Sequence, residues 1–160
     1  MESVHKKFLD ELLEAEKLWQ SADHFIYITL PVVKDNKLMV RALENLYRCL
    51  VIVISNILKF EYLYKRVSLS KDSGKNLDVF FSKCSLRYGI LEDDAKILKD
   101  IVFLGKKHKE SGFEFSRQGK VIILDDSLKS SELSVEKMKI YLRVVRKLLE
   151  NTNKGFRVVY

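Results

Sequence analysis

Proline and glycine are scarce in this chain, which has one proline and six glycines among its 160 residues. Both residue types interrupt helices and mark turns, so their scarcity argues against a sandwich of short strands and favours long uninterrupted helices. A chain of this length can bury one hydrophobic core without disulfides or metal ions. Its 47% hydrophobic and 32% charged residues are typical of a globular protein. We therefore expect a single domain over residues 1–160.

Cysteines and long apolar runs are also few. Cys49 and Cys84 lie in apolar periodic segments without CxxC spacing, and the N-terminus does not resemble a signal peptide. We predict reduced core thiols in a cytoplasmic protein, and the alternative is a disulfide between them. The longest apolar run, residues 49–58, has about half the length that a bilayer requires, so we expect no membrane partner.

Motifs of the common catalytic classes are missing. The chain has no GxxxxGK[ST], GxGxxG or GxSxG, which argues against P-loop nucleotide hydrolysis and serine-hydrolase chemistry. None of the three histidines has a histidine or cysteine at metal-ligand spacing, so we predict neither a metal site nor a cofactor. The acid pairs Asp93-Asp94 and Asp125-Asp126 could hold a divalent cation, but acids at helix starts and in loops are the commoner explanation.

The hydrophobic periodicity predicts a mainly α protein, a bundle of about five helices with a small β-hairpin inserted before the last helix. Pro31 should end or kink the helical path at or before Leu30. Gln118-Gly119 has the form of a two-residue hairpin turn, and Ser134 is suited to cap the last helix. The expected elements are an N-terminal helix over 3–24, a central helix over 36–67, helices over 76–88 and 91–110, a hairpin over 113–124 and a last helix over 135–150.

The positive charge is unevenly distributed along the chain, whose net charge is +7. Residues 134–160 contain seven basic and two acidic residues, and residues 36–67 contain six and two. Such asymmetry indicates a polyanionic partner, although lysine-rich solvated helix faces are common. The candidate nucleic-acid-binding residues are Lys106, Lys107, Lys109, Arg117, Lys139, Arg143, Arg146 and Lys147.

Three features together resemble the HEPN superfamily of small helical bundles. They are a long apolar helix that opens with Arg41-Ala-Leu-Glu-Asn-Leu-Tyr-Arg48, a later helix that ends in a histidine, and a basic last helix. The resemblance covers a core of roughly residues 36–150 and implies the bundle fold and a homodimer. Many HEPN proteins are RNases that join an Arg-x4-6-His motif from each subunit, whereas others are toxins paired with an antitoxin or noncatalytic RNA binders.

The RNase motif itself is absent. An arginine partner for His108 would stand at residues 101–103, which are Ile, Val and Phe here. The neighbouring lysines bring charge but lack the guanidinium fork, and they should favour the neutral form of His108.

Three hypotheses follow. The first is a noncatalytic module that binds RNA or a protein partner through the basic residues. The second is a degenerate, metal-independent RNase or toxin-like protein that uses His108 as its catalytic residue. The third is a purely structural homodimer, and it is compatible with the first.

Overall fold

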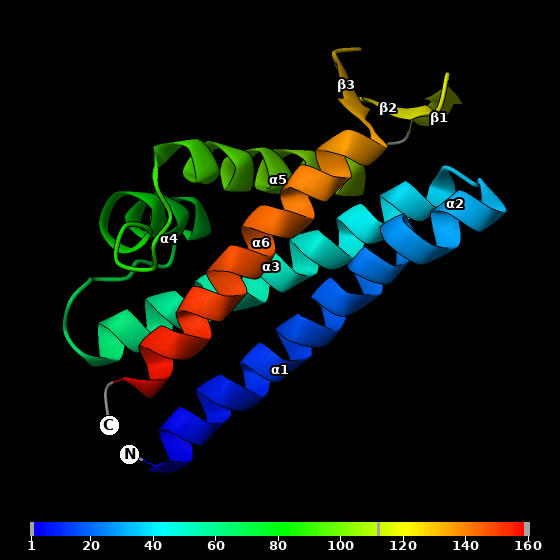
Figure 1. The fold of residues 1–160 in the computed structure, drawn as a ribbon. Coiled ribbons are helices and arrows are strands. Elements are labelled where there is room, and N and C mark those ends of the chain that lie inside the picture. The colour runs from blue at the N-terminus through cyan, green and yellow to red at the C-terminus, as the bar shows by residue number, and fades with distance from the viewer. Residues whose placement is uncertain (1, 112, 159–160) are drawn as a thin grey trace.

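The computed structural model describes residues 2–111 and 113–158, and it is mainly helical with one small sheet (Figure 1). This confirms the predicted fold class. The elements in chain order are α1 (Glu2–His24), the π-helix η1 (Phe25–Thr29), α2 (Leu30–Val33), α3 (Lys37–Leu63), α4 (Ser73–Val79), the π-helix η2 (Phe80–Cys84), α5 (Glu92–Glu110), β1 (Phe113–Arg117), β2 (Lys120–Leu124), β3 (Ser130–Leu133) and α6 (Val135–Arg157).

Three long helices build the bundle. α1 runs alongside α3, and α6 packs against both, with α5 against α3 and α6 (Figure 1). The core forms because α3 is apolar on most of its surface, and Met39, Leu46 and Ile57 are fully buried. Cys49 and Cys84 are free thiols buried in this core. Burial, together with the Glu16 carboxylate, raises the pKa of the Cys49 thiol to about 12, as expected for an inert core cysteine.

The helix does not end at or before Leu30, since the chain stays helical through Val33. Instead, η1 forms one π-helical segment, and the backbone N–H of Leu30 donates to the carbonyl of Phe25. A wider turn accommodates the proline ring, which would clash with the carbonyl four residues earlier in a regular α-helix. The path ends at Lys34, which adopts a left-handed conformation with φ of 58°.

The sheet has three antiparallel strands in the order β1-β2-β3, so the predicted hairpin is correct but incomplete. Gln118 and Gly119 have φ of 50° and 75°, as a two-residue hairpin turn requires. The additional strand β3 pairs with β2 in the register Val121↔Leu133, and both of these side chains are buried. The sheet connects the end of α5 to the start of α6.

Candidate nucleic-acid interface

His108, the candidate catalytic residue, lies in the last turn of α5 between two carboxylates. Its Nε2 is 2.7 Å from Oε1 of Glu44 on α3, and its Nδ1 hydrogen-bonds Oε1 of Glu114 on β1. The side chain is 17% exposed. The imidazole therefore joins α5 to the neighbouring strand β1 and to α3, which is distant in the sequence.

The two carboxylates determine the charge of His108. Burial of the ring lowers its pKa, but the hydrogen bonds and negative charges of Glu114 and Glu44 outweigh burial and raise the pKa above 6.5. The prediction of a neutral His108 was therefore wrong. It considered only the lysines adjacent in sequence, whereas the groups that contact the ring come from other elements.

A groove beside His108 is lined by Glu44, Tyr47 and Arg48 of α3 and by the end of α5. The helices come close here because residue 105 is glycine: a Cβ at this position would lie 2.4 Å from Cδ2 of Tyr47. Arg48 shares the groove with His108. Sequence reasoning missed this neighbour because it searched for an arginine within the same segment as the histidine.

The arrangement around His108 is suited to holding the fold together. A general base needs a ring nitrogen with a free lone pair, and a general acid needs an N–H directed at the substrate. Both ring nitrogens of His108 instead contact carboxylates. These carboxylates would also repel an approaching phosphate.

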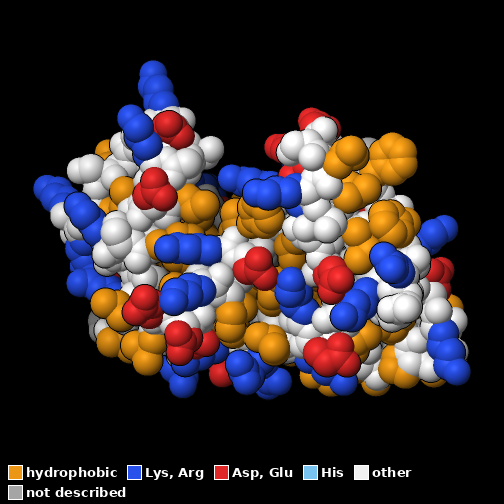
Figure 2. Space-filling model, turned by 90° about the horizontal axis from the view of Figure 1, so that it is seen from above, with side chains coloured by type: hydrophobic (Ala, Val, Ile, Leu, Met, Phe, Trp, Pro, Cys, Tyr) orange, Lys and Arg blue, Asp and Glu red, His pale blue; other side chains and the backbone are white. Residues whose placement is uncertain are grey.

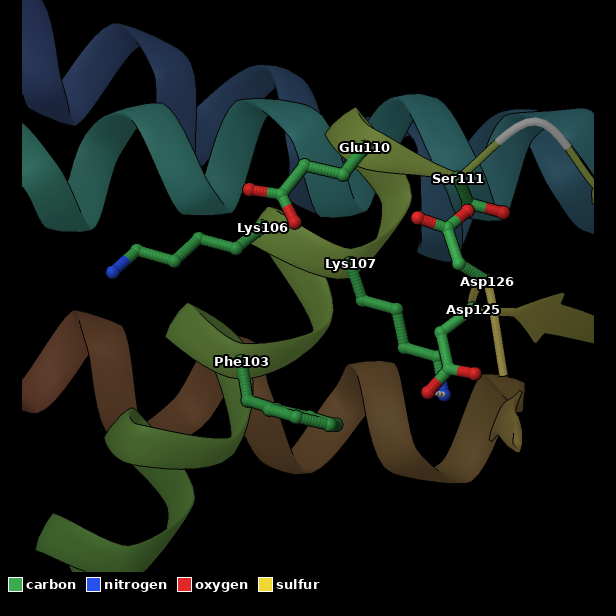
Figure 3. A pocket seen from close by; sticks show the side chains of 7 residues that line it. All are labelled: Phe103, Lys106, Lys107, Glu110, Ser111, Asp125 and Asp126. Carbon is green, nitrogen blue, oxygen red and sulfur yellow. Dashed lines mark ion pairs between the residues drawn. The ribbon is translucent and has the colours of Figure 1, made fainter. Parts of the chain in front are cut away.

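Lys107 is not at the surface, contrary to its prediction as a phosphate contact. It is 7% exposed, and its ammonium donates to Oγ of Ser131 at 2.7 Å and lies 3.9 Å from Oδ2 of Asp125. Figure 3 shows Lys107 pointing from α5 toward Asp125, beside the ring of Phe103. A buried ammonium needs such partners, so Lys107 connects α5 to the sheet.

One acid of each pair has partners within the chain. The carboxylate of Asp125 caps its own loop by accepting from the backbone N–H groups of Ser127 and Lys129, and the Lys129 bond is the largest of the effects that lower its pKa. Asp94 pairs with Lys147 at 3.0 Å. Within residues 2–111 and 113–158, no three potential metal ligands come together.

The four cations predicted on the last helix are all exposed, and we call them the α6 basic face: Lys139, Arg143, Arg146 and Lys147. Two of them have acidic partners, since Nε of Arg146 is 3.0 Å from Glu150 and Nζ of Lys147 is 3.0 Å from Asp94. Exposed pairs of this kind are worth little, so an incoming phosphate can compete with them. Arg143 has no ion pair or side-chain hydrogen bond with any described residue.

Aromatic rings of the N-terminal segment lie next to this face. Nζ of Lys139 is 5.2 Å from the ring centroid of Tyr27 in η1, and Cζ of Arg146 is 5.3 Å from that of Trp19 in α1. The sequence did not reveal these contacts because they join the two ends of the chain. Tyr141, by contrast, is buried and donates its hydroxyl to Asp100, so it packs rather than stacks.

The other predicted cations lie on other elements. Lys106 and Lys109 are exposed at the end of α5, and Arg117 is exposed at the end of β1. Figure 2 shows Lys and Arg side chains spread across the face seen from above, with acidic side chains among them. The α6 basic face is the largest of the predicted groups on one element, with four exposed cations between residues 139 and 147.

No family model matches the chain, and comparisons with curated proteins and with solved structures found no match. Within the part of the chain that the structure describes, no helix has the length and apolar character needed to cross a membrane.

Proposed function

We propose that this protein is a HEPN-like helical module that binds the RNA backbone without cleaving it, and that the α6 basic face is the binding surface. The observation that carries the proposal is the exposure of all four cations along one side of a long helix. Residues 139 to 147 span about 12 Å at the rise of an α-helix. The spacing suits contact with successive phosphates of one strand rather than with a single ion.

The aromatic neighbours support a single-stranded ligand. Tyr27 is 47% exposed, and its ring lies beside Lys139. Proteins that bind single strands combine a cationic track with aromatic rings on which bases stack. Tyr27 can release Lys139 to a phosphate and stack on a base at little cost, because an exposed cation–π contact contributes only about 0.5–1 kcal/mol.

The contacts of His108 support binding without cleavage. Its two ring nitrogens contact Glu44 and Glu114, and one of these carboxylates would have to be displaced before His108 could act on a ribose hydroxyl. Among the functions that the HEPN resemblance implies, we therefore favour noncatalytic RNA binding.

The test is fluorescence anisotropy with a labelled unstructured RNA at low salt. A variant with glutamate at all four positions of the α6 basic face should bind at least about 100-fold more weakly, because each lost phosphate contact costs roughly 1 kcal/mol or more. Equal affinity of the variant would contradict the proposal. A protein that binds no RNA, and instead captures a protein through α6, would also contradict it.

A second candidate function is RNA cleavage, and it is favoured by one observation: Arg48 and His108 line the same groove. If this candidate is correct, the purified protein releases a 2′,3′-cyclic phosphate product in the presence of a chelator, and His108→Ala and Arg48→Ala each abolish the release. A protein that leaves structured and unstructured RNA intact excludes it.

A homodimer is compatible with either function. Phe113 and Phe115 are 70% and 45% exposed on β1, which has a partner strand on one side only within the described chain. Hydrophobic side chains gather at the end of the molecule that carries the sheet (Figure 2). We expect sedimentation to show a dimer at micromolar concentration and Phe115→Lys to shift it to monomer, whereas a wild-type monomer contradicts the expectation.

A further inference from the structure

A buried carboxylate lies at the end of α3. Glu61 is 2% exposed, and its Oε1 accepts from the hydroxyl of Tyr88 at 2.8 Å. Nη1 of Arg87 donates to Oε2 at 2.9 Å, and Nη1 of Arg66 lies 3.3 and 3.2 Å from the two oxygens. One carboxylate thus fixes two guanidinium groups side by side.

Both guanidinium groups have donors left for a ligand. Each has five N–H groups and uses only Nη1 on Glu61, and neither makes another side-chain hydrogen bond within the described residues. The side chains of Arg66 and Arg87 are 36% and 51% exposed. Arg66 also lies over the ring of Tyr64, 5.3 Å from its centroid, which limits its movement.

The last turns of α6 form the opposite wall. Two glycines allow α6 to approach: a Cβ at Gly155 would lie 3.1 Å from Cε1 of Tyr88, and one at Gly89 would lie 2.6 Å from Nδ2 of Asn151. The same Nδ2 donates to the carbonyl of Tyr88 at 2.8 Å. Lys154, one turn further on, is exposed, lines the same pocket and has no ion pair within the described chain.

These residues line an open pocket of about 510 Å³ at the end of the bundle opposite the sheet, where α6 ends near the end of α3 (Figure 1). Its charged lining residues are Arg66, Arg87, Lys154 and Glu61, so its net charge is +2. Glu61 compensates one of three cations. The remaining positive charge lies in a concave site whose arginines are already oriented.

We propose that this pocket binds a phosphate group. A phosphate monoester has a charge of about −1.5 to −2 at neutral pH and three acceptor oxygens, which matches both the charge and the donors of the pocket. Guanidinium forks bind phosphate through two parallel hydrogen bonds, and Lys154 adds a point charge from the other wall. A single carboxylate ligand would leave one cation uncompensated.

This site is separate from the proposed RNA surface and does not depend on it. The lining of the pocket includes none of the four residues of the α6 basic face. Its phosphate ligand could be free phosphate or the terminal phosphate of an RNA, since both present the same charged oxygens. Binding of inorganic phosphate therefore tests the pocket alone, and its result does not depend on whether the α6 basic face binds RNA.

The experiment is isothermal titration calorimetry of the full chain with inorganic phosphate at moderate salt. Wild type should bind one phosphate per chain, and Lys154→Glu should weaken binding about 10-fold or more, because it removes one charged donor and adds a repelling carboxylate. Arg157→Glu is the matched control: Arg157 is exposed one turn later on α6, does not line the pocket, and the charge change is identical.

Arg87→Lys is a second variant. It keeps a positive charge next to Glu61 but removes the guanidinium group and its paired N–H donors. It should also weaken phosphate binding while the thermal midpoint stays close to that of wild type. The absence of phosphate binding by wild type, or equal loss in Lys154→Glu and Arg157→Glu, would overturn the proposal.

A further titration with RNA oligonucleotides that differ only in a 5′-phosphate identifies the source of the ligand. Tighter binding of the phosphorylated strand, lost in Lys154→Glu, assigns the pocket to an RNA end. Equal binding of the two strands, with phosphate binding intact, assigns it to a small phosphate compound. The variant with glutamates on the α6 basic face should keep its phosphate binding in either case.

Discussion

At the scale of single residues, partners from other elements decide what each titratable group can do. His108 and Glu61 show this in opposite senses. The carboxylates of Glu44 and Glu114 occupy a histidine that would otherwise be a candidate base, whereas the carboxylate of Glu61 orients two arginines whose outer donors stay available. Contacts with carboxylates thus occupy both ring nitrogens of His108, whereas at Glu61 they orient two arginines and leave N–H donors available for a ligand.

His108 makes stability depend on pH. Because its pKa in the folded protein is raised above 6.5, the imidazolium stabilises the fold fully below pH 6.5, and this contribution is lost as pH rises through the folded pKa. At pH 6, His108→Gln should lower the free energy of unfolding by about 2 kcal/mol, the scale of hydrogen bonds to charged groups. The difference from wild type should shrink at pH 9.

Urea unfolding at the two pH values measures this effect. His24→Gln serves as the control, since His24 is exposed and its side chain makes no hydrogen bond with the described residues. A difference between wild type and His108→Gln that is the same at pH 6 and pH 9 would show that the imidazolium does not stabilise the fold.

At the scale of elements, capping side chains mark where helices begin. Oγ of Ser134 accepts from the backbone N–H of Lys137 at 3.2 Å, whereas Asn36 precedes α3 without any side-chain capping bond. Ser134→Ala should therefore cost about 1 kcal/mol of stability. Asn36→Ala should change it by about 0.5 kcal/mol or less. Thermal unfolding of the two variants compares them directly, and equal losses would contradict the assignment of Ser134 as the cap.

Periodic elements could be predicted from the sequence, whereas elements made by tertiary pairing could not. The central helix and the Gln118-Gly119 turn were expected because apolar spacing and turn chemistry are local signals. β3 was missed because its sequence, Ser-Ser-Glu-Leu, has one apolar residue. It forms because β2 offers unpaired backbone groups and Leu133 is buried opposite Val121.

The end of α6 was also missed. Asn151, Asn153 and Gly155 have low helix propensity, which favoured an end near residue 150. The helix continues to Arg157 because Phe156 is buried against the ring of Phe60, with centroids 4.4 Å apart. This extension places Lys154 in the lining of the pocket beside Glu61. The sequence could not predict this pocket, because it depends on packing that local helix propensity opposes.

At the scale of the whole molecule, its two ends differ. The sheet end has exposed phenylalanines, the opposite end has the Glu61 pocket, and the α6 basic face lies between them on the helix that joins the two (Figure 1). Net charge alone does not distinguish these regions, since Lys and Arg side chains are spread across the face seen in Figure 2. What singles out α6 is the regular spacing of its cations and the rings beside them.

The most direct test of the central claim is the salt dependence of RNA binding. Four phosphate contacts on a single strand predict that log K falls with log salt concentration with a slope of about −3. The variant with glutamates at Lys139, Arg143, Arg146 and Lys147 should lose nearly all of this slope. A matched variant with the same change of charge, and glutamates at the exposed Lys59, Lys71, Lys75 and Lys83, should keep it. If both variants lose the slope equally, binding follows net charge alone and the α6 basic face is not the RNA-binding surface.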